Sequence, residues 1–313
     1  MGRMHPKSRR ALAKFAIGIL PNICASSVAR GQDLEPRRWT LLPVGTNVFG
    51  VGYGYTSGDL AFDPVLRIED VEFDLHTASL AFSRYFGLFG ETARFDALVP
   101  FQSGQWKGLV DGEATSVRRD GMADPIFRFS YSFLGAPAIE PQDFAEYRQE
   151  NPVSTALGAA VELKVPWGEY MDDKLINLGQ NRFAIAPQVG LLHTHEDWSF
   201  ELTAATFFYT QNDDFFGGNE LDQDPLFALQ THVVKVFDNG LWLSCGAAYG
   251  WGGESSVNGE NLDDDRRNLL YGAAFGSALF DNQSIRIGYV RANTLTDIGG
   301  DSHTFYVGWS IRF

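Results

Sequence analysis

The final nine residues of the chain alternate strictly between two kinds of side chain. The residues of one parity, here the odd-numbered positions, are apolar: Phe305, Val307, Trp309, Ile311 and Phe313. The residues of the other parity, the even-numbered positions, are smaller or more polar: Tyr306, Gly308, Ser310 and Arg312. Successive side chains of a β-strand point to opposite faces of the sheet. The pattern therefore predicts a C-terminal strand with one apolar face and one wet face.

The same alternation recurs along the chain after Trp39. It is clear in residues 49–55, 93–101, 127–133, 157–165, 198–203, 241–251, 285–289 and 305–313, and weaker in residues 78–85, 183–191, 226–236 and 269–279. These segments predict twelve strands. An even number of strands is typical of bacterial barrels that are built from a single chain.

The connections between these segments alternate in length. Short ones fall near residues 87–91, 193–197, 237–240 and 280–283, and long polar ones fall near 57–74, 102–123, 168–181, 211–224, 252–267 and 291–302. Short periplasmic turns and long outer loops are characteristic of outer-membrane barrels. We therefore predict an all-β fold, a transmembrane antiparallel β-barrel of about twelve strands, closed by the C-terminal strand that ends in Phe313. A longer periplasmic connection, residues 135–153, has room for one helical turn.

The N-terminus has the pattern of a secretory signal. Basic residues between Arg3 and Lys14 precede and enter an apolar stretch at residues 11–20, and small residues follow at 27–31. We predict a signal peptide at residues 1–31, a periplasmic segment at 32–43 and a barrel at 44–313. The expected location is the outer membrane of a Gram-negative bacterium.

Charge and cysteine content narrow the function. Residues 1–31 hold six of the 25 Lys and Arg residues and none of the 39 Asp and Glu residues, so 19 basic residues remain against 39 acidic ones. A surplus of acid argues against nucleic acid as a partner. Cys245 is the one cysteine that would remain, which excludes an intramolecular disulfide.

Several charged residues occupy the inward parity of predicted strands. A charge on the lipid face costs roughly 2–4 kcal/mol near the membrane midplane, so these residues are expected to face the lumen. The candidate pore-lining residues are Arg94, Asp96, Arg128, Glu162, Lys164, Glu201 and Arg286. They either fill the lumen with salt bridges or line a pore and tune its selectivity; a barrel of twelve strands is intermediate in width between filled and open ones.

Residues 98–102, 121–135 and above all 165–190 resemble the outer-membrane transporter family named for the meta-pathway of phenol degradation. The motif is carried by Pro166, Gly168, Tyr170, Lys174, Leu175, Asn177, Gly179, Asn181, Arg182 and Pro187. Phe183 replaces the family's usual Trp. The resemblance runs from about Val44 to Phe313. It implies a barrel that takes up small hydrophobic or aromatic compounds, and it supplies no catalytic residues.

The motif falls mostly on a predicted outer loop. Either the loop caps or narrows the mouth of the barrel, or Tyr170, Asn177 and Asn181 contact a passing solute. These three residues are our candidate mouth-loop residues.

Other chemistries have weaker support. His193 and His195 form a pair in a turn, but zinc sites normally need three or four ligands, so we predict no metal. Cofactors are not expected. Ser302 and His303, the best hydrolase candidates, are neighbours on a strand and therefore point to opposite faces. We predict that the chain is not an enzyme.

The primary functional hypothesis is a channel for passive uptake of small hydrophobic or aromatic solutes. The alternative is a structural or adhesive barrel with a filled lumen, and a surface hydrolase ranks last. The expected partners are outer-membrane lipid and lipopolysaccharide, the small solute itself, and the barrel-assembly machinery, which would read the C-terminal strand ending in Phe313.

Overall fold

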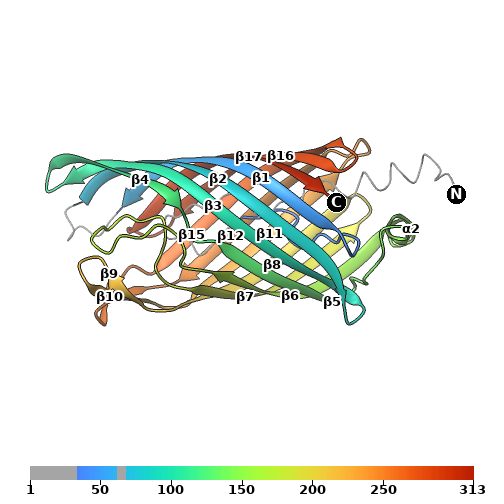
Figure 1. The fold of residues 1–313 in the computed structure, drawn as a ribbon, viewed down its shortest axis with the longest axis horizontal. Coiled ribbons are helices and arrows are strands. Elements are labelled where there is room, and N and C mark those ends of the chain that lie inside the picture. Colours follow the sequence, from blue (N-terminus) through green and yellow to red (C-terminus); the bar gives the residue numbers. More distant parts are fainter. Residues whose placement is uncertain (1–33, 62–67) are drawn as a thin grey trace.

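The structure, a computed structural model, describes residues 34–61 and 68–313. Within these residues, twelve antiparallel strands form a closed barrel (Figure 1). The barrel strands are β1 (Asn47–Ala61), β2 (Ile68–Leu88), β3 (Glu91–Val110), β5 (Ile126–Leu134), β6 (Val153–Lys164), β7 (Ala184–His195), β8 (Trp198–Tyr209), β11 (Leu226–Val236), β12 (Trp242–Gly252), β15 (Arg266–Phe280), β16 (Gln283–Thr294) and β17 (Gly299–Arg312). These twelve strands correspond to the twelve segments predicted from the alternation.

The barrel closes where its first strand meets its last. β1 pairs with β17 along its length, and Asn47 exchanges two backbone hydrogen bonds with Phe313, at 2.9 and 3.0 Å. β2 pairs with both β1 and β3, so every neighbouring pair around the wall is hydrogen-bonded. The predicted closure by the C-terminal strand is therefore confirmed.

The two parities of each strand lie where the alternation predicted. Large apolar side chains such as Phe101, Val161, Phe200 and Phe305 are exposed on the outer surface of the wall, while their neighbours on the strand face inward and are buried or half-buried. An apolar band outside a closed hydrogen-bonded sheet is what a lipid bilayer requires, because backbone groups have no water there to bond with.

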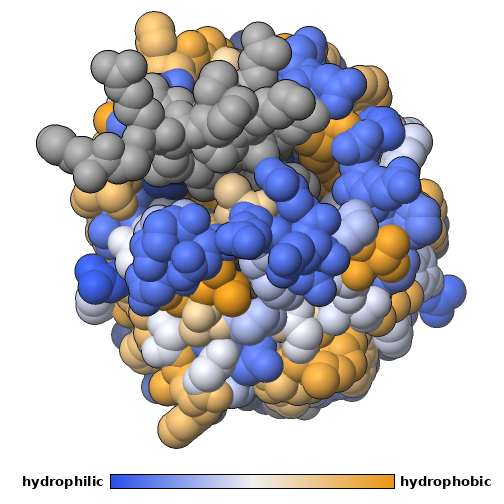
Figure 2. Space-filling view, turned by 90° about the vertical axis from the view of Figure 1, so that its right-hand side faces the viewer, coloured by the Kyte–Doolittle hydropathy of each residue, from blue (hydrophilic) through white to orange (hydrophobic). Residues whose placement is uncertain are grey.

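The turns at one end of the barrel are short, and this end is periplasmic by the usual rule for outer-membrane barrels. The longer connection at that end, where the sequence left room for one helical turn, contains the seven-residue helix α2 (Phe144–Glu150). Figure 2 views this end and shows hydrophilic side chains across it and hydrophobic ones along much of its perimeter. No helix among the described residues is long and apolar enough to cross a membrane.

At the opposite end, β2 and β3 extend beyond the wall together with a further strand, β4 (Glu113–Met122). A small separate sheet lies in the outer loops and contains β9 (Asn212–Phe215), β10 (Asn219–Gln223), β13 (Ser255–Val257) and β14 (Glu260–Asn261). The outer loops are thus more ordered than the sequence predicted, because strand pairing continues into them.

The N-terminal segment differs from the prediction. Residues 32–43 were expected to form a periplasmic segment, whereas the described part, residues 34–43, lies inside the barrel. Leu34, Trp39 and Leu42 are buried, and so are the charged residues of the segment, Glu35, Arg37 and Arg38. The reason is chemical: these charges find opposite charges and amide groups on the inner wall. The predicted signal peptide, residues 1–31, lies outside the described residues.

Candidate functional site

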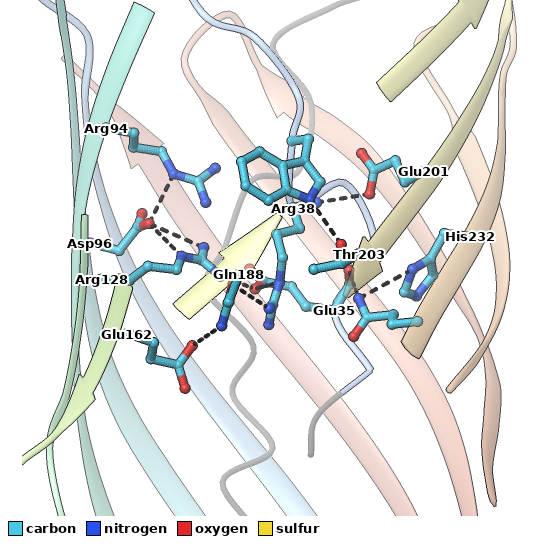
Figure 3. A network of polar contacts seen from close by, with 12 residues as sticks. Glu35, Arg38, Arg94, Asp96, Arg128, Glu162, Gln188, Glu201, Thr203 and His232 are labelled. Carbon is cyan, nitrogen blue, oxygen red and sulfur yellow. Dashed lines mark hydrogen bonds and ion pairs between the residues drawn. The ribbon is translucent and has the colours of Figure 1, made fainter. Parts of the chain in front are cut away.

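The barrel interior contains a buried network of charged side chains (Figure 3). On the wall, Asp96 of β3 accepts hydrogen bonds from Arg94 at 2.9 Å and from Nε of Arg128 on β5 at 3.1 Å. Ser83 of β2 donates a further hydrogen bond to Asp96 at 2.6 Å. All four residues are buried. Three of the predicted pore-lining residues, Arg94, Asp96 and Arg128, therefore lie together on the inner wall.

The N-terminal segment completes this network. Glu35 accepts a hydrogen bond from Nη1 of Arg128 at 2.8 Å and one from Arg38 at 3.1 Å. Arg38 also donates to the side chain of Gln188 on β7 at 3.0 Å. Arg128 therefore joins a carboxylate of the segment to Asp96 of the wall. Buried charges are stable only when they are paired and hydrogen-bonded, and this network provides both.

Trp39 anchors the segment against two paired glycines. Its indole nitrogen donates to Thr203 of β8 at 2.8 Å. Its ring lies on Gly158 of β6 and Gly190 of β7, which face each other in the sheet register. A Cβ atom at Gly190 would lie 1.8 Å from the Trp39 ring, and one at Gly158 would lie 2.7 Å from it. Only glycine leaves room for the indole at these two positions.

The other candidate pore-lining residues are spread over the inner wall. Glu201 of β8 is buried and accepts the backbone N–H of Arg38 at 3.0 Å, and Glu162 of β6 accepts a hydrogen bond from Gln188 at 3.3 Å. Arg286 of β16 is fully buried, with its guanidinium 5.3 Å from the ring centre of Tyr306. Lys164, at the outer end of β6, is only partly buried.

The predicted mouth-loop residues hold the outer loops together. The side chain of Asn177 accepts a hydrogen bond from the backbone N–H of Met171 and donates to the carbonyl oxygens of Met171 and Lys174, each at 2.9 Å. Tyr170 donates to the carbonyl oxygen of Asp214 at 3.0 Å, which joins this loop to β9. Asn181 adopts a φ of 52° and donates to the side chain of Asn212 on β9 at 2.9 Å. These contacts fold the loop of residues 165–183 and fix it to its neighbour.

Arg182, next in the loop, lies over an aromatic ring. Its guanidinium is 4.7 Å from the ring centre of Tyr209 at the end of β8. Burial lowers the pKa of Arg182 to about 10, and the nearby Tyr209 opposes this shift. Arg182 is therefore still a cation at neutral pH, as a cation–π contact requires.

Asp124, between β4 and β5, joins the two ends of the same loop through hydrogen bonds. It is buried, and its two carboxylate oxygens accept the backbone N–H groups of Gly168 at 3.0 Å and Gln180 at 2.8 Å. Burial raises the pKa of Asp124, although these two hydrogen bonds act in the opposite direction. One side chain thus ties together both ends of the loop.

Replacing Asp124 with alanine is expected to loosen the loop of residues 165–183, because two partly buried N–H groups lose their acceptor at a cost of about 1 kcal/mol each. Hydrogen exchange at Gly168 and Gln180 should accelerate, while the barrel strands keep their protection. Asp173→Ala is the matched control, since Asp173 is exposed in the same loop. Unchanged exchange in Asp124→Ala would contradict this role.

The remaining candidates do not form a reactive centre. Ser302 is buried on the inner face, whereas His303 is exposed on the outer face and its Nδ1 lies 2.6 Å from the hydroxyl of Tyr289. The two therefore point apart, as expected. His193 lies 2.9 Å from the hydroxyl of Thr155. Within residues 34–61 and 68–313, no three His, Cys, Asp or Glu side chains are grouped as metal ligands.

Sequence reasoning missed the part of the site that comes from residues 34–39. It also missed its amide and hydroxyl partners on the wall, Gln188, Thr203 and Gln230. The alternation predicted that these polar side chains face the interior, but it did not indicate which segment of the chain they contact. Glycines at inward positions of two adjacent strands were the one signal of a close approach.

Solved structures share the fold. The COG4313 outer membrane channel from Pseudomonas putida F1 is 20% identical, with a TM-score of 0.73 over 90% of this chain and 100% of that one. The transport unit of the autotransporter AIDA-I from Escherichia coli is 11% identical, with a TM-score of 0.51 over 90% of this chain and 93% of that one. No curated protein sequence matches. Residues 48–313 match the family described as "Putative MetA-pathway of phenol degradation", and the chain belongs to that family.

Proposed function

We propose that this protein is an outer-membrane channel for the passive uptake of small hydrophobic or aromatic solutes. The observation that carries the proposal is a closed twelve-stranded barrel with an apolar outer face and a charged, polar interior. The family, which is described by a pathway of phenol degradation, supports an aromatic solute. The similar fold from Pseudomonas putida F1, which is called an outer membrane channel, supports transport.

In this proposal the N-terminal segment is the internal constriction of the channel. Its charged residues contact inward residues of β5, β7 and β8, and Gln230 of β11 donates to the carbonyl oxygen of Glu35 at 3.1 Å. The polar residues Arg94, Asp96, Arg128, Glu162 and Glu201 would then tune what passes beside the segment.

The same segment favours a second candidate function, a structural barrel with a filled lumen. Buried ion pairs and the packed Trp39 are also what a permanent interior filling would contain. The two functions differ in a measurable property, which is permeation.

The test is single-channel recording of the refolded chain from residue 32 in a planar bilayer, together with uptake of phenols and alkylbenzenes into liposomes that contain it. A channel is expected to give conductance steps that aromatic solutes block, and to accelerate uptake over empty liposomes. A folded barrel that shows neither conductance nor accelerated uptake would overturn the channel and favour the filled structural barrel.

A further inference from the structure

An apolar cavity of about 190 Å³ lies at the outer mouth, between the extended sheet of β2, β3 and β4 and the loop of residues 165–183. Its sheet side includes Val71, Trp106 and Val117, and its loop side includes Ile176. Phe216, at the tip of the hairpin of β9 and β10, also lines it. The lining is therefore mostly aliphatic and aromatic and is drawn from three separate parts of the outer loops.

The cavity has a packed floor. Val71, Trp106 and Leu178 belong to one cluster of buried apolar residues, and Ile176 packs against it. The benzo part of the Trp106 indole lies against Gly104, where a Cβ atom would be 2.5 Å from the ring. Asn177 fixes the loop side through its hydrogen bonds to Met171 and Lys174. The cavity is thus built by the fold, and Trp106 is packed in its wall.

Four charged residues line this mostly apolar cavity, Lys107, Arg119, Asp173 and Lys174, and Lys174 pairs with Asp173. Arg119 faces inward from β4 beside Val117, and its backbone pairs with Gly104 of β3. Nε of Arg119 donates to the carbonyl oxygen of Ile176 at 2.8 Å, and Nη1 donates to the carbonyl oxygen of Arg118 at 2.9 Å. These two bonds fix the guanidinium, and its Nη2 makes no hydrogen bond to another described residue. A held guanidinium with a spare donor suits an oxygen acceptor on a ligand.

We propose that this cavity binds a single-ring aromatic molecule that carries an oxygen acceptor, such as a phenol or a benzoate, before it passes into the barrel. An apolar cavity of about 150 Å³ is large enough for one benzene molecule, so this cavity fits one substituted ring. The ring packs against Trp106 and Val117, and its oxygen accepts from Arg119. This inference rests on the proposed uptake function, and it locates the first contact of the solute.

The test is a fluorine NMR titration of the full folded chain in detergent with para-fluorophenol, para-fluorobenzoate and para-fluorotoluene. Val117→Trp fills the cavity and is expected to weaken binding of all three probes by at least about tenfold. Arg119→Gln removes the guanidinium and is expected to weaken the phenol and the benzoate roughly tenfold, with little change for the toluene.

The strand supplies matched controls, because neighbouring residues face the other side. Ser116→Trp and Arg118→Gln change the exposed outer face of β4 and should bind all three probes as the unaltered chain does. Equal binding by Val117→Trp and the unaltered chain would overturn the site. If that happened while liposome uptake persisted, the inference would fail and the channel would stand; binding without uptake would overturn the channel and support the site.

Discussion

A refolded chain that begins at residue 44 is expected to conduct several-fold more current than one that begins at residue 32. Residues 34–43 lie inside the barrel, and twelve strands enclose a lumen wider than the eight-stranded barrels that side chains alone fill. Removing the segment would leave Asp96, Arg128 and Glu201 facing water. Single-channel recording in a planar bilayer measures the change, and equal conductance of the two chains would contradict a constriction by this segment.

A point substitution tests the same conclusion without shortening the chain. Gly190→Leu would place a side chain where the indole of Trp39 lies and is expected to displace the segment and raise conductance. Val189→Leu is the matched control, because Val189 immediately precedes Gly190 on β7 and is exposed on the lipid face. Circular dichroism of both variants establishes that the barrel still forms.

Replacing Arg128 with methionine is expected to destabilise the protein by about 3–5 kcal/mol, the usual cost of breaking a buried ion pair. Arg128 is 2.8 Å from Glu35 and 3.1 Å from Asp96, and all three are buried. Arg38 and Arg94 would still pair with these carboxylates, but the link that Arg128 makes between Glu35 of the segment and Asp96 of the wall would be lost. The midpoint of urea unfolding in liposomes measures the loss.

Arg118→Met is the control for this loss. Arg118 pairs with Asp120 at 2.8 Å, but both side chains are more than half exposed, and such pairs contribute about 0–1 kcal/mol. Adding Glu35→Gln to Arg128→Met should recover part of the stability, because the pair is coupled. An Arg128→Met variant as stable as Arg118→Met would contradict the role of Arg128.

The wall of the barrel was predictable because each strand must place one parity in lipid. Phe101 and Phe305, for example, indicate which face of their strands points to lipid, whatever fills the interior. The inward charges were predictable for the same reason, since lipid would not tolerate them. Their grouping was also partly predictable: Arg128 faces Asp96 and Glu162 in the register of three consecutive strands.

The rest depended on contacts that alternation does not encode. Trp39 was predicted to lie in a periplasmic segment, because the twelve residues 32–43 have no strand pattern and therefore give no indication of where they pack. Tyr170, Asn177 and Asn181 were predicted as loop residues, but their hydrogen bonds to other loops required the folded chain. β4 was not predicted, because the consecutive charged residues Arg118, Arg119 and Asp120 interrupt the alternation of apolar and polar side chains. This strand pairs with the part of β3 that extends beyond the barrel wall.

The position of the N-terminal segment also constrains the order of assembly. The segment leads directly into β1, which forms the seam with β17, yet its partners lie far along the chain: Arg38 meets Glu201 across 163 residues, and Glu35 meets Gln230 across 195. Contacts of such long sequence separation form slowly. Residues 34–43 can therefore reach their final contacts only once β8 and β11, which supply Glu201 and Gln230, are in place.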